Sequence, residues 1–259
     1  MVSSAGSLAS ENQFLSEQFL DARNDLSPAT EIEDPPVRCR LPNRFAAFYR
    51  ATVGKKVVMA VSGLMLLVFV VGHLAGNLQI FLGREALNDY AALLRRTPEL
   101  LWPVRIGLLA ALILHIVASA QLVIANRRAR PTPYAVKRDI ETNYAARTMA
   151  ISGPLVLLYV IYHLAMFTFL ATGPGYSHTD VYRNVVQAFQ SPTISAVYIA
   201  AMLLLGLHLY HGIWSMLHTL GISSPHYRWL RHGLAPVVAV VITAGYISIP
   251  LAVLVGVIE

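Results

Sequence analysis

The chain of 259 residues contains a single cysteine, Cys39. One thiol cannot form an intrachain disulfide, a Cys-x-x-Cys-His haem attachment or a thiolate metal cluster. Any cofactor must therefore be held without bonds to cysteine.

Charged residues are also scarce, at 13% of the chain against about 25% in a typical soluble domain. They are missing from five long blocks, 57–83, 106–126, 148–179, 184–227 and 232–258. A transmembrane helix needs roughly 20 apolar residues. The composition therefore predicts an all-α integral membrane protein with five transmembrane helices, near 57–82, 103–126, 148–172, 193–217 and 233–257.

The positive charges are distributed unevenly between the predicted loops. Five of the 20 Lys and Arg residues (Arg84, Arg95, Arg96, Arg105 and Arg183) fall on one side of the predicted membrane, and the other 15 fall on the opposite side. Basic loops stay in the cytoplasm, so the bias predicts a cytoplasmic N-terminus and an external C-terminus. It also explains the formal net charge of +6 without any nucleic acid partner.

The chain divides by composition into a cytoplasmic N-terminal arm, 1–43, and a five-helix transmembrane domain, 44–259. The arm is rich in acidic residues and lacks the pattern of a signal peptide; a partly helical arm and a disordered tail both fit it. The 83–102 loop has a helical pattern that suits the membrane interface. The 173–192 loop begins with the turn signal GPGY. No internal repeat of fixed period is evident.

Histidines are the only readily titratable side chains inside the predicted spans, and they are His73, His115, His163, His208 and His211. An ionisable group within a membrane is costly, so each is a candidate functional residue. A lone histidine is more simply explained by a hydrogen bond to a backbone carbonyl on a facing helix. Four helices that each carry one call for a common explanation.

The depths of these histidines correlate. His73 lies 18 residues outward from Lys55, and His163 lies 16 residues outward from Arg147. His115 and His208 lie 12 and ten residues before the cytoplasmic ends of their helices. At about 1.5 Å per residue, His73 and His163 share an outer layer and His115 and His208 an inner one, separated by very roughly 10 Å.

Two histidines at one depth on facing helices suit the axial ligands of one haem iron. The sequence therefore predicts two b-type haems, with iron ligands His73, His163, His115 and His208. Zinc would need further carboxylate or thiolate ligands, and a histidine proton relay would not need pairs of equal depth. Gly72, Gly76, Gly153, Gly206 and Gly212 near these histidines would let a flat macrocycle approach the backbone, although small residues also favour ordinary helix packing.

Three segments carry a family resemblance: GKKVVMAVSGLMLLVFVVGHLAGNLQIFLGREALNDYA, YAARTMAISGPLVLLYVIYHLAMFTFL and HLYHGIWSMLHTLG. In this order they resemble the single-chain, five-helix, diheme cytochrome b subunit of succinate dehydrogenase and fumarate reductase. The resemblance covers about 44–222. Helix five matches only in position and hydropathy, and the acidic arm looks longer than is usual in the family.

The resemblance implies a multi-pass subunit of the inner (cytoplasmic) membrane that anchors a flavoprotein and an iron–sulfur subunit. The subunit would not act on succinate by itself. Electrons would pass from the iron–sulfur subunit to an inner haem held by His115 and His208, then to an outer haem held by His73 and His163, and on to a quinone, expected to be menaquinone. The reverse path applies to fumarate reduction. The basic inner face suits the docking of an acidic partner surface, and the complex can oligomerise further.

The resemblance places the inner ligand at the first histidine of HLYHG, His208, and His211 then falls near the haem propionates as a supporting group. The quinone site stays open between Asn77, Gln79 and Tyr90 at the outer end and Ser215, His218 and Tyr227 at the inner end. Two other classes remain: the diheme cytochrome b of another quinone-linked oxidoreductase, such as formate dehydrogenase or a cytochrome b561-type carrier, and a haem-free transporter or structural anchor.

Overall fold

The structure, a computed structural model, describes residues 43–129, 144–172, 175–222 and 228–259. The chain separates into two units, Met1–Pro42 and Asn43–Glu259. The predicted arm lies outside the described residues except for its last position. Within the described part, all regular structure is helical, which confirms the all-α class.

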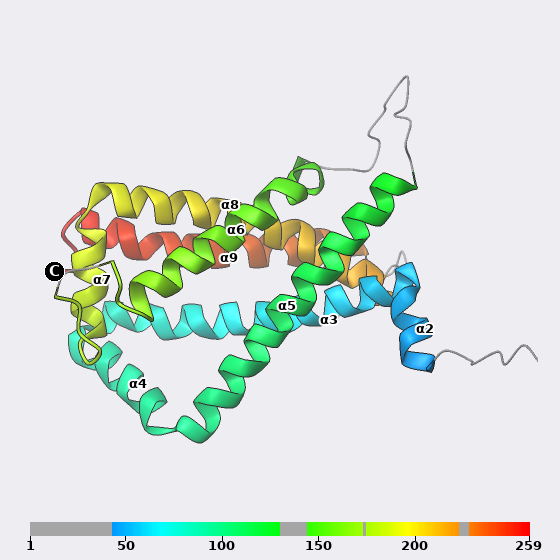
Figure 1. The fold of residues 1–259 in the computed structure, drawn as a ribbon. Coiled ribbons are helices and arrows are strands. Elements are labelled where there is room, and N and C mark those ends of the chain that lie inside the picture. Colours follow the sequence, from blue (N-terminus) through cyan, green and yellow to red (C-terminus); the bar gives the residue numbers. More distant parts are fainter. Residues whose placement is uncertain (1–42, 130–143, 173–174, 223–227) are drawn as a thin grey trace, which may run out of the picture. The chain divides into compact units, whose positions relative to one another are not determined.

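The described elements follow the order expected from the charge-free blocks (Figure 1). They are α2 (Arg44–Arg50), α3 (Thr52–Asn77), the 3-10 helix η1 (Leu78–Leu82), α4 (Arg84–Arg96), α5 (Pro98–Arg128), α6 (Tyr144–Phe167), α7 (Val181–Phe189), α8 (Pro192–Thr219) and α9 (Arg228–Leu254).

Five helices are long and apolar enough to cross a membrane, covering Thr52–Leu82, Pro98–Arg128, Ala145–Phe167, Pro192–Thr219 and His232–Leu254. Large apolar side chains on them are exposed, among them Val68, Leu109, Leu158 and Val240. An exposed apolar surface of this extent suits lipid contact. The chain is therefore a multi-pass helical membrane protein, as predicted.

The third span ends earlier than the predicted 172, at Phe167. The backbone turns back on itself here: the amides of Thr168 and Phe169 both donate to the carbonyl of Leu164, and Leu170 adopts a positive φ of 51°. The sequence around this turn stays apolar, so hydropathy does not reveal where the helix stops. The prediction was wrong by about one helical turn at this end.

The spans pack unevenly around α8. Helix α3 packs against α5, α6 packs against α8, and α9 lies along α8. Two glycines permit close approach to α9: a Cβ at Gly206 would meet Thr243 Oγ1 at 2.4 Å, and one at Gly245 would meet Leu74 Cδ2 at 2.9 Å. These contacts fix α9 to the side of the bundle formed by α3 and α8.

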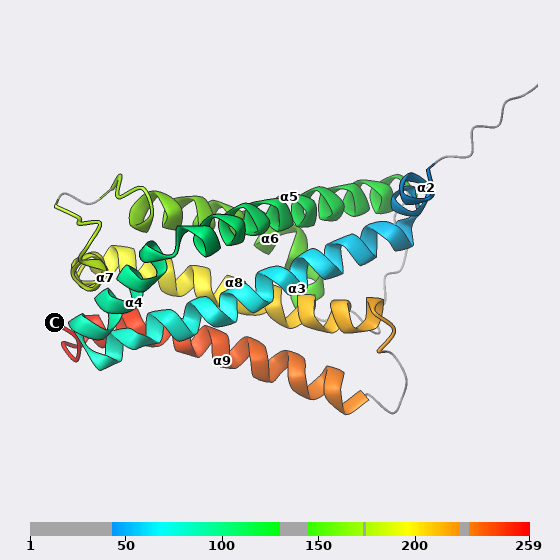
Figure 2. The ribbon, with the colours of Figure 1, turned by 90° about the horizontal axis from the view of Figure 1, so that it is seen from below.

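Three short helices lie at the two ends of the spans. Helix α2 runs across the direction of the spans at one end, while α4, α7 and the C-terminus gather at the other (Figures 1 and 2). The expected helix within 83–102 is confirmed as α4. Helix α7 was not predicted, and its inward face supplies Val185, Val186 and Phe189 to the core.

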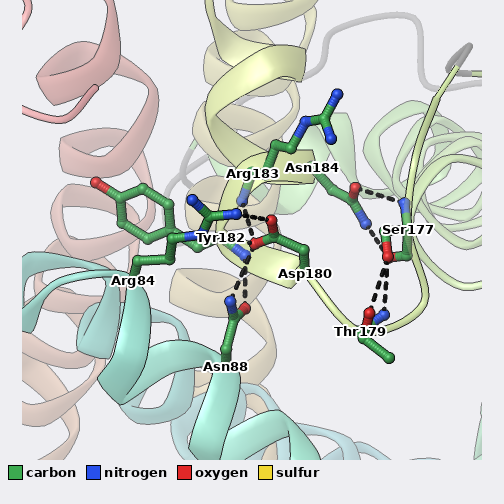
Figure 3. Close-up of polar contacts among 8 residues, drawn as sticks. All are labelled: Arg84, Asn88, Ser177, Thr179, Asp180, Tyr182, Arg183 and Asn184. Atoms are coloured by element: carbon green, nitrogen blue, oxygen red, sulfur yellow. Dashed lines mark hydrogen bonds and ion pairs between the residues drawn. The ribbon is translucent and has the colours of Figure 1, made fainter.

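Asp180 joins α4 to α7 (Figure 3). It caps the start of α7 by accepting from the Arg183 amide at 3.2 Å, accepts from Asn88 Nδ2 at 3.0 Å, and forms an ion pair with Arg84. Asn88 Oδ1 in turn accepts from the Tyr182 amide at 3.1 Å. We call Arg84, Asn88 and Asp180 the α4–α7 latch.

Candidate haem sites

The structure brings the four predicted ligand histidines together in two pairs. His73 on α3 lies beside His163 on α6, with ring centroids 5.9 Å apart and planes at 77°. His115 on α5 lies beside His208 on α8, with centroids 6.3 Å apart and planes at 60°. These are the pairs expected from depth along the spans.

The separation within each pair suits two imidazoles that share one metal ion. With metal–nitrogen bonds of about 2.0 Å, two imidazoles on opposite sides of one ion have centroids about 6 Å apart. Within the described part of the chain, no group of three or more His, Cys, Asp or Glu side chains forms a metal-binding cluster. Each site thus offers two imidazoles, the number that a haem iron leaves for the protein.

The paired histidines come from helices that are held apart. Helix α3 packs closely on α5, and α6 packs closely on α8. The pairs that carry the paired histidines, α3 with α6 and α5 with α8, are not among the closely packed helix pairs. Each histidine pair therefore spans a wider interhelical gap. All four histidines are half-buried.

The inner pair has backbone and small residues among its contacts. His115 Nδ1 lies 3.1 Å from the Met59 carbonyl oxygen and 3.5 Å from Ser62 Oγ. A carbonyl can only accept, so this contact places the proton on Nδ1 and leaves the Nε2 lone pair free for a metal. His208 Nδ1 is buried and has no hydrogen-bond partner among the described residues.

The outer pair is surrounded by aromatic rings. Phe69 stacks on His73 at 5.3 Å with planes at 9°, and Tyr246 from α9 lies 6.2 Å from the same ring. Tyr159, Phe167 and Tyr198 lie 5.8, 5.6 and 6.1 Å from His163. The two layers thus place chemically different walls around similar histidine pairs.

Tyr198 also forms a polar contact with the outer pair. Its Oη lies 3.4 Å from His163 Nδ1 and 3.4 Å from Met166 Sδ. If the phenol donates to the sulfur, its oxygen accepts from Nδ1–H and leaves His163 Nε2 free. Tyr198 is 5% exposed and Met166 1%, so packing holds this arrangement. No sequence motif marked Tyr198, which lies ten residues before His208.

His211 stands apart from the inner pair. Its ring stacks on Trp214 at 6.2 Å, and Trp214 stacks on His218 at 5.8 Å. The three rings form a column along one face of α8 toward its C-terminus. His218 is exposed, as the interface position predicts, while a contact of His211 with a haem propionate stays a prediction.

The glycines singled out from the sequence fall into different environments. A Cβ at Gly76 would meet the Tyr90 ring at 2.6 Å, and one at Gly206 would meet Thr243, so these two serve helix packing. Beside Gly72 and Gly212, an added Cβ would meet no heavy atom within 4 Å in the part of the chain that the structure describes. Gly153 faces His208, and Gly63, which was not among the predicted glycines, faces His115.

The candidate quinone residues are partly engaged elsewhere. Asn77 Nδ2 donates to the His73 carbonyl at 2.7 Å, and the Tyr90 ring packs on Gly76. Gln79 and Ser215 are half-buried, and Tyr227 lies outside the described residues. The contacts therefore leave the choice between the two ends open.

No protein-family model, no curated protein and no solved structure matches the chain. Any function must therefore be argued from the fold and from the two histidine pairs.

Proposed function

We propose that the chain is a diheme cytochrome b. The observation that carries this proposal is the presence of two histidine pairs, each drawn from two separate spans, with ring separations of 5.9 and 6.3 Å. The contact of His115 Nδ1 with the Met59 carbonyl supports the same reading, because a ligand imidazole binds through one nitrogen and is oriented through the other. The buried Nδ1 of His208 has no partner among the described residues and would be satisfied by a bound group.

The roles of the chain's own residues follow from this assignment. His73 and His163 would hold the outer haem, and His115 and His208 the inner one. A bound haem supplies one-electron transfer through its iron. The Met59 carbonyl orients His115, the phenol of Tyr198 orients His163, and the aromatic rings of the outer layer limit the access of water to that site.

Within this class, the particular function we propose is the membrane-anchor subunit of a succinate:quinone oxidoreductase. The resemblance of 44–222 to that family supports this choice, and the five apolar helices meet its architectural requirement. A flavoprotein, an iron–sulfur subunit and a quinone are the partners so proposed, in the inner cytoplasmic membrane. The subunit would carry electrons between the iron–sulfur subunit and the quinone without acting on succinate alone.

Purification of the chain from its native membrane tests both levels of the proposal. We expect sharp reduced-minus-oxidised α-bands, two haems per chain, and copurification of a flavoprotein and an iron–sulfur protein. Replacement of His73 or His163 by Ala should remove one haem and largely spare the other. A chain with no haem would refute the class, whereas a diheme chain that copurifies with a different oxidoreductase would refute only the particular function.

A further inference from the structure

Helices α3 and α6 carry the same sequence pattern around their histidines. Residues 61–75 read VSGLMLLVFVVGHLA, and residues 151–165 read ISGPLVLLYVIYHLA. Seven of the 15 aligned positions are identical at a constant offset of 90: Ser62/Ser152, Gly63/Gly153, Leu67/Leu157, Val70/Val160, His73/His163, Leu74/Leu164 and Ala75/Ala165. This match corrects the expectation that the chain has no internal repeat.

The structural context of the two segments is also repeated. Each begins a unit that consists of a span, a short helix at the same end of the spans, and a second span: α3–α4–α5 and α6–α7–α8 (Figures 1 and 2). The two spans pack together within each unit, and α4 and α7 contact each other across the junction. Such repeats in membrane proteins are commonly related by a two-fold axis.

Equivalent residues play equivalent parts in the outer layer. His73 and His163 are repeat mates, and they are also the two members of the outer pair. Each has an aromatic ring against it from four residues earlier, Phe69 at 5.3 Å and Tyr159 at 5.8 Å. Phe69 and Tyr159 differ by the same offset of 90, so the repeat extends from sequence to contacts.

The inner layer shows the same correspondence through the glycines. A Cβ on Gly63 would lie 3.1 Å from His115 Cε1, and one on Gly153 would lie 3.8 Å from His208 Cε1. Each glycine thus faces the histidine on the second span of its own unit. Among the described residues, and apart from the glycine's own helix backbone, the imidazole is the only group within 4 Å of the added Cβ at both positions.

This environment differs from that of the packing glycines. A Cβ on Gly206 or Gly245 would collide with a side chain of a neighbouring helix at 2.4 or 2.9 Å. Beside Gly63 and Gly153 the group that an added Cβ would meet is a predicted haem ligand, at 3.1 Å for His115 and 3.8 Å for His208. Both glycines precede the outer histidine of their helix by ten residues, so each lies about 15 Å from that histidine along its helix.

We propose that α3–α4–α5 and α6–α7–α8 are two copies of one unit, and that Gly63 and Gly153 are the matched walls of the inner haem site. This inference rests on the proposed diheme function. In it, each unit gives the outer site one histidine and gives the inner site one histidine and one glycine. The absence of a side chain at each glycine leaves room for the imidazole beside it, and a larger residue there would push that imidazole out of place.

The test replaces each wall glycine by Val in the complete complex and measures haem content and midpoint potentials for each layer. We expect Gly63→Val and Gly153→Val to lower the inner-haem content at least tenfold and to leave the outer haem in place. Gly233→Val serves as the matched control, because Gly233 lies exposed on α9 and no heavy atom of the described residues falls within 4 Å of an added Cβ. Gly63→Ala and Gly153→Ala are measured in parallel, in case the Val variants fail to fold.

The outcomes separate this inference from the function on which it rests. A wild-type chain without haem refutes the diheme function. The wall assignment is refuted if the wild-type chain holds two haems and all four glycine variants keep the full inner-haem content with an unchanged midpoint potential. Loss of the outer haem in place of the inner one also refutes it. An effect from Gly63 alone contradicts the equivalence of the two units.

Discussion

Replacement of Asp180 by Ala should release α7 from α4. The carboxylate receives three kinds of contact: the Arg183 amide at the start of α7, Asn88 Nδ2, and the Arg84 guanidinium. A helix N-cap contributes about 1 kcal/mol, and a hydrogen bond to a charged acceptor contributes about 1.5 kcal/mol. The Arg84 side chain is 62% exposed, so its ion pair adds about 0.5 kcal/mol.

Together these contributions amount to a loss of about 3 kcal/mol in the local stability of α7 for Asp180→Ala. This is an upper value, because Asn88 and Arg84 can turn toward water in the variant. Asp180→Asn should cost about 1 kcal/mol, since Asn is an equally good cap but carries no charge. The assay is amide hydrogen exchange of α7 in detergent or nanodiscs. A loss of 3 kcal/mol corresponds to roughly 100-fold faster exchange if α7 opens locally.

Asp89→Ala is the matched control, since Asp89 is an exposed carboxylate on α4 next to the latch residue Asn88. It should leave α7 exchange nearly unchanged. If Asp180→Ala and Asp89→Ala have the same effect, the latch does not hold α7 and the reasoning fails.

The same carboxylate gives the α4–α7 latch a defined dependence on pH. The hydrogen bond from Asn88, followed by the contacts with Arg84 and the Arg183 amide, lowers the pKa of Asp180, although burial acts in the opposite direction. A lowered pKa in the folded state means that the stabilisation is complete above the ordinary value of about 3.9. It is lost as the pH falls through the folded-state pKa. Protection of α7 should thus be constant from about pH 5 to 7 and fall only below about pH 4, and Asp180→Asn should remove this acid-induced loss.

Three further predictions concern the histidine layers and the orientation. His208→Ala should lose the inner haem and quinone reductase activity. His211→Ala should keep the haem with a shifted potential, and His218→Ala should change little. If His211→Ala empties the inner site while His208→Ala leaves it filled, the ligand assignment is wrong by one turn. Tyr198→Phe removes the hydroxyl that would accept from His163 Nδ1–H, a hydrogen bond that contributes about 0.5–1 kcal/mol. For a one-electron couple this energy corresponds to about 20–40 mV, so the variant should raise the outer-haem potential by that amount. Tyr162→Phe is its control, since the Tyr162 ring lies 6.0 Å from Tyr198, and equal shifts in the two variants would contradict the role of Tyr198. A reporter fused after Glu259 should be active only outside the cytoplasm, and activity inside would reverse the orientation.

The spans were predictable because lipid imposes a simple requirement on sequence. A helix that crosses the membrane needs a long stretch without charges, and five such stretches were present. The pairing of His73 with His163 and of His115 with His208 also followed from depth alone, because helical rise converts residue number into height.

Other features lacked a local signal. Helix α7 spans only Val181–Phe189, and its stability depends on the latch and on buried contacts with other helices, which the sequence does not reveal. Gly63 was missed because its partner His115 lies 52 positions away. The repeat was missed because its two copies are separated by 90 residues, whereas a fixed-period search favours three or more adjacent copies.

The order of the spans along the chain has a consequence for biogenesis. His73 and His163 are both present once the third span has been synthesised, but His115 has no partner until His208 emerges, 45 positions after His163. At about 5–20 residues per second, this delay amounts to about 2–9 s. The outer pair is thus complete in the nascent chain seconds before the inner one, and a ribosome stalled between the third and fourth spans would present the outer pair alone.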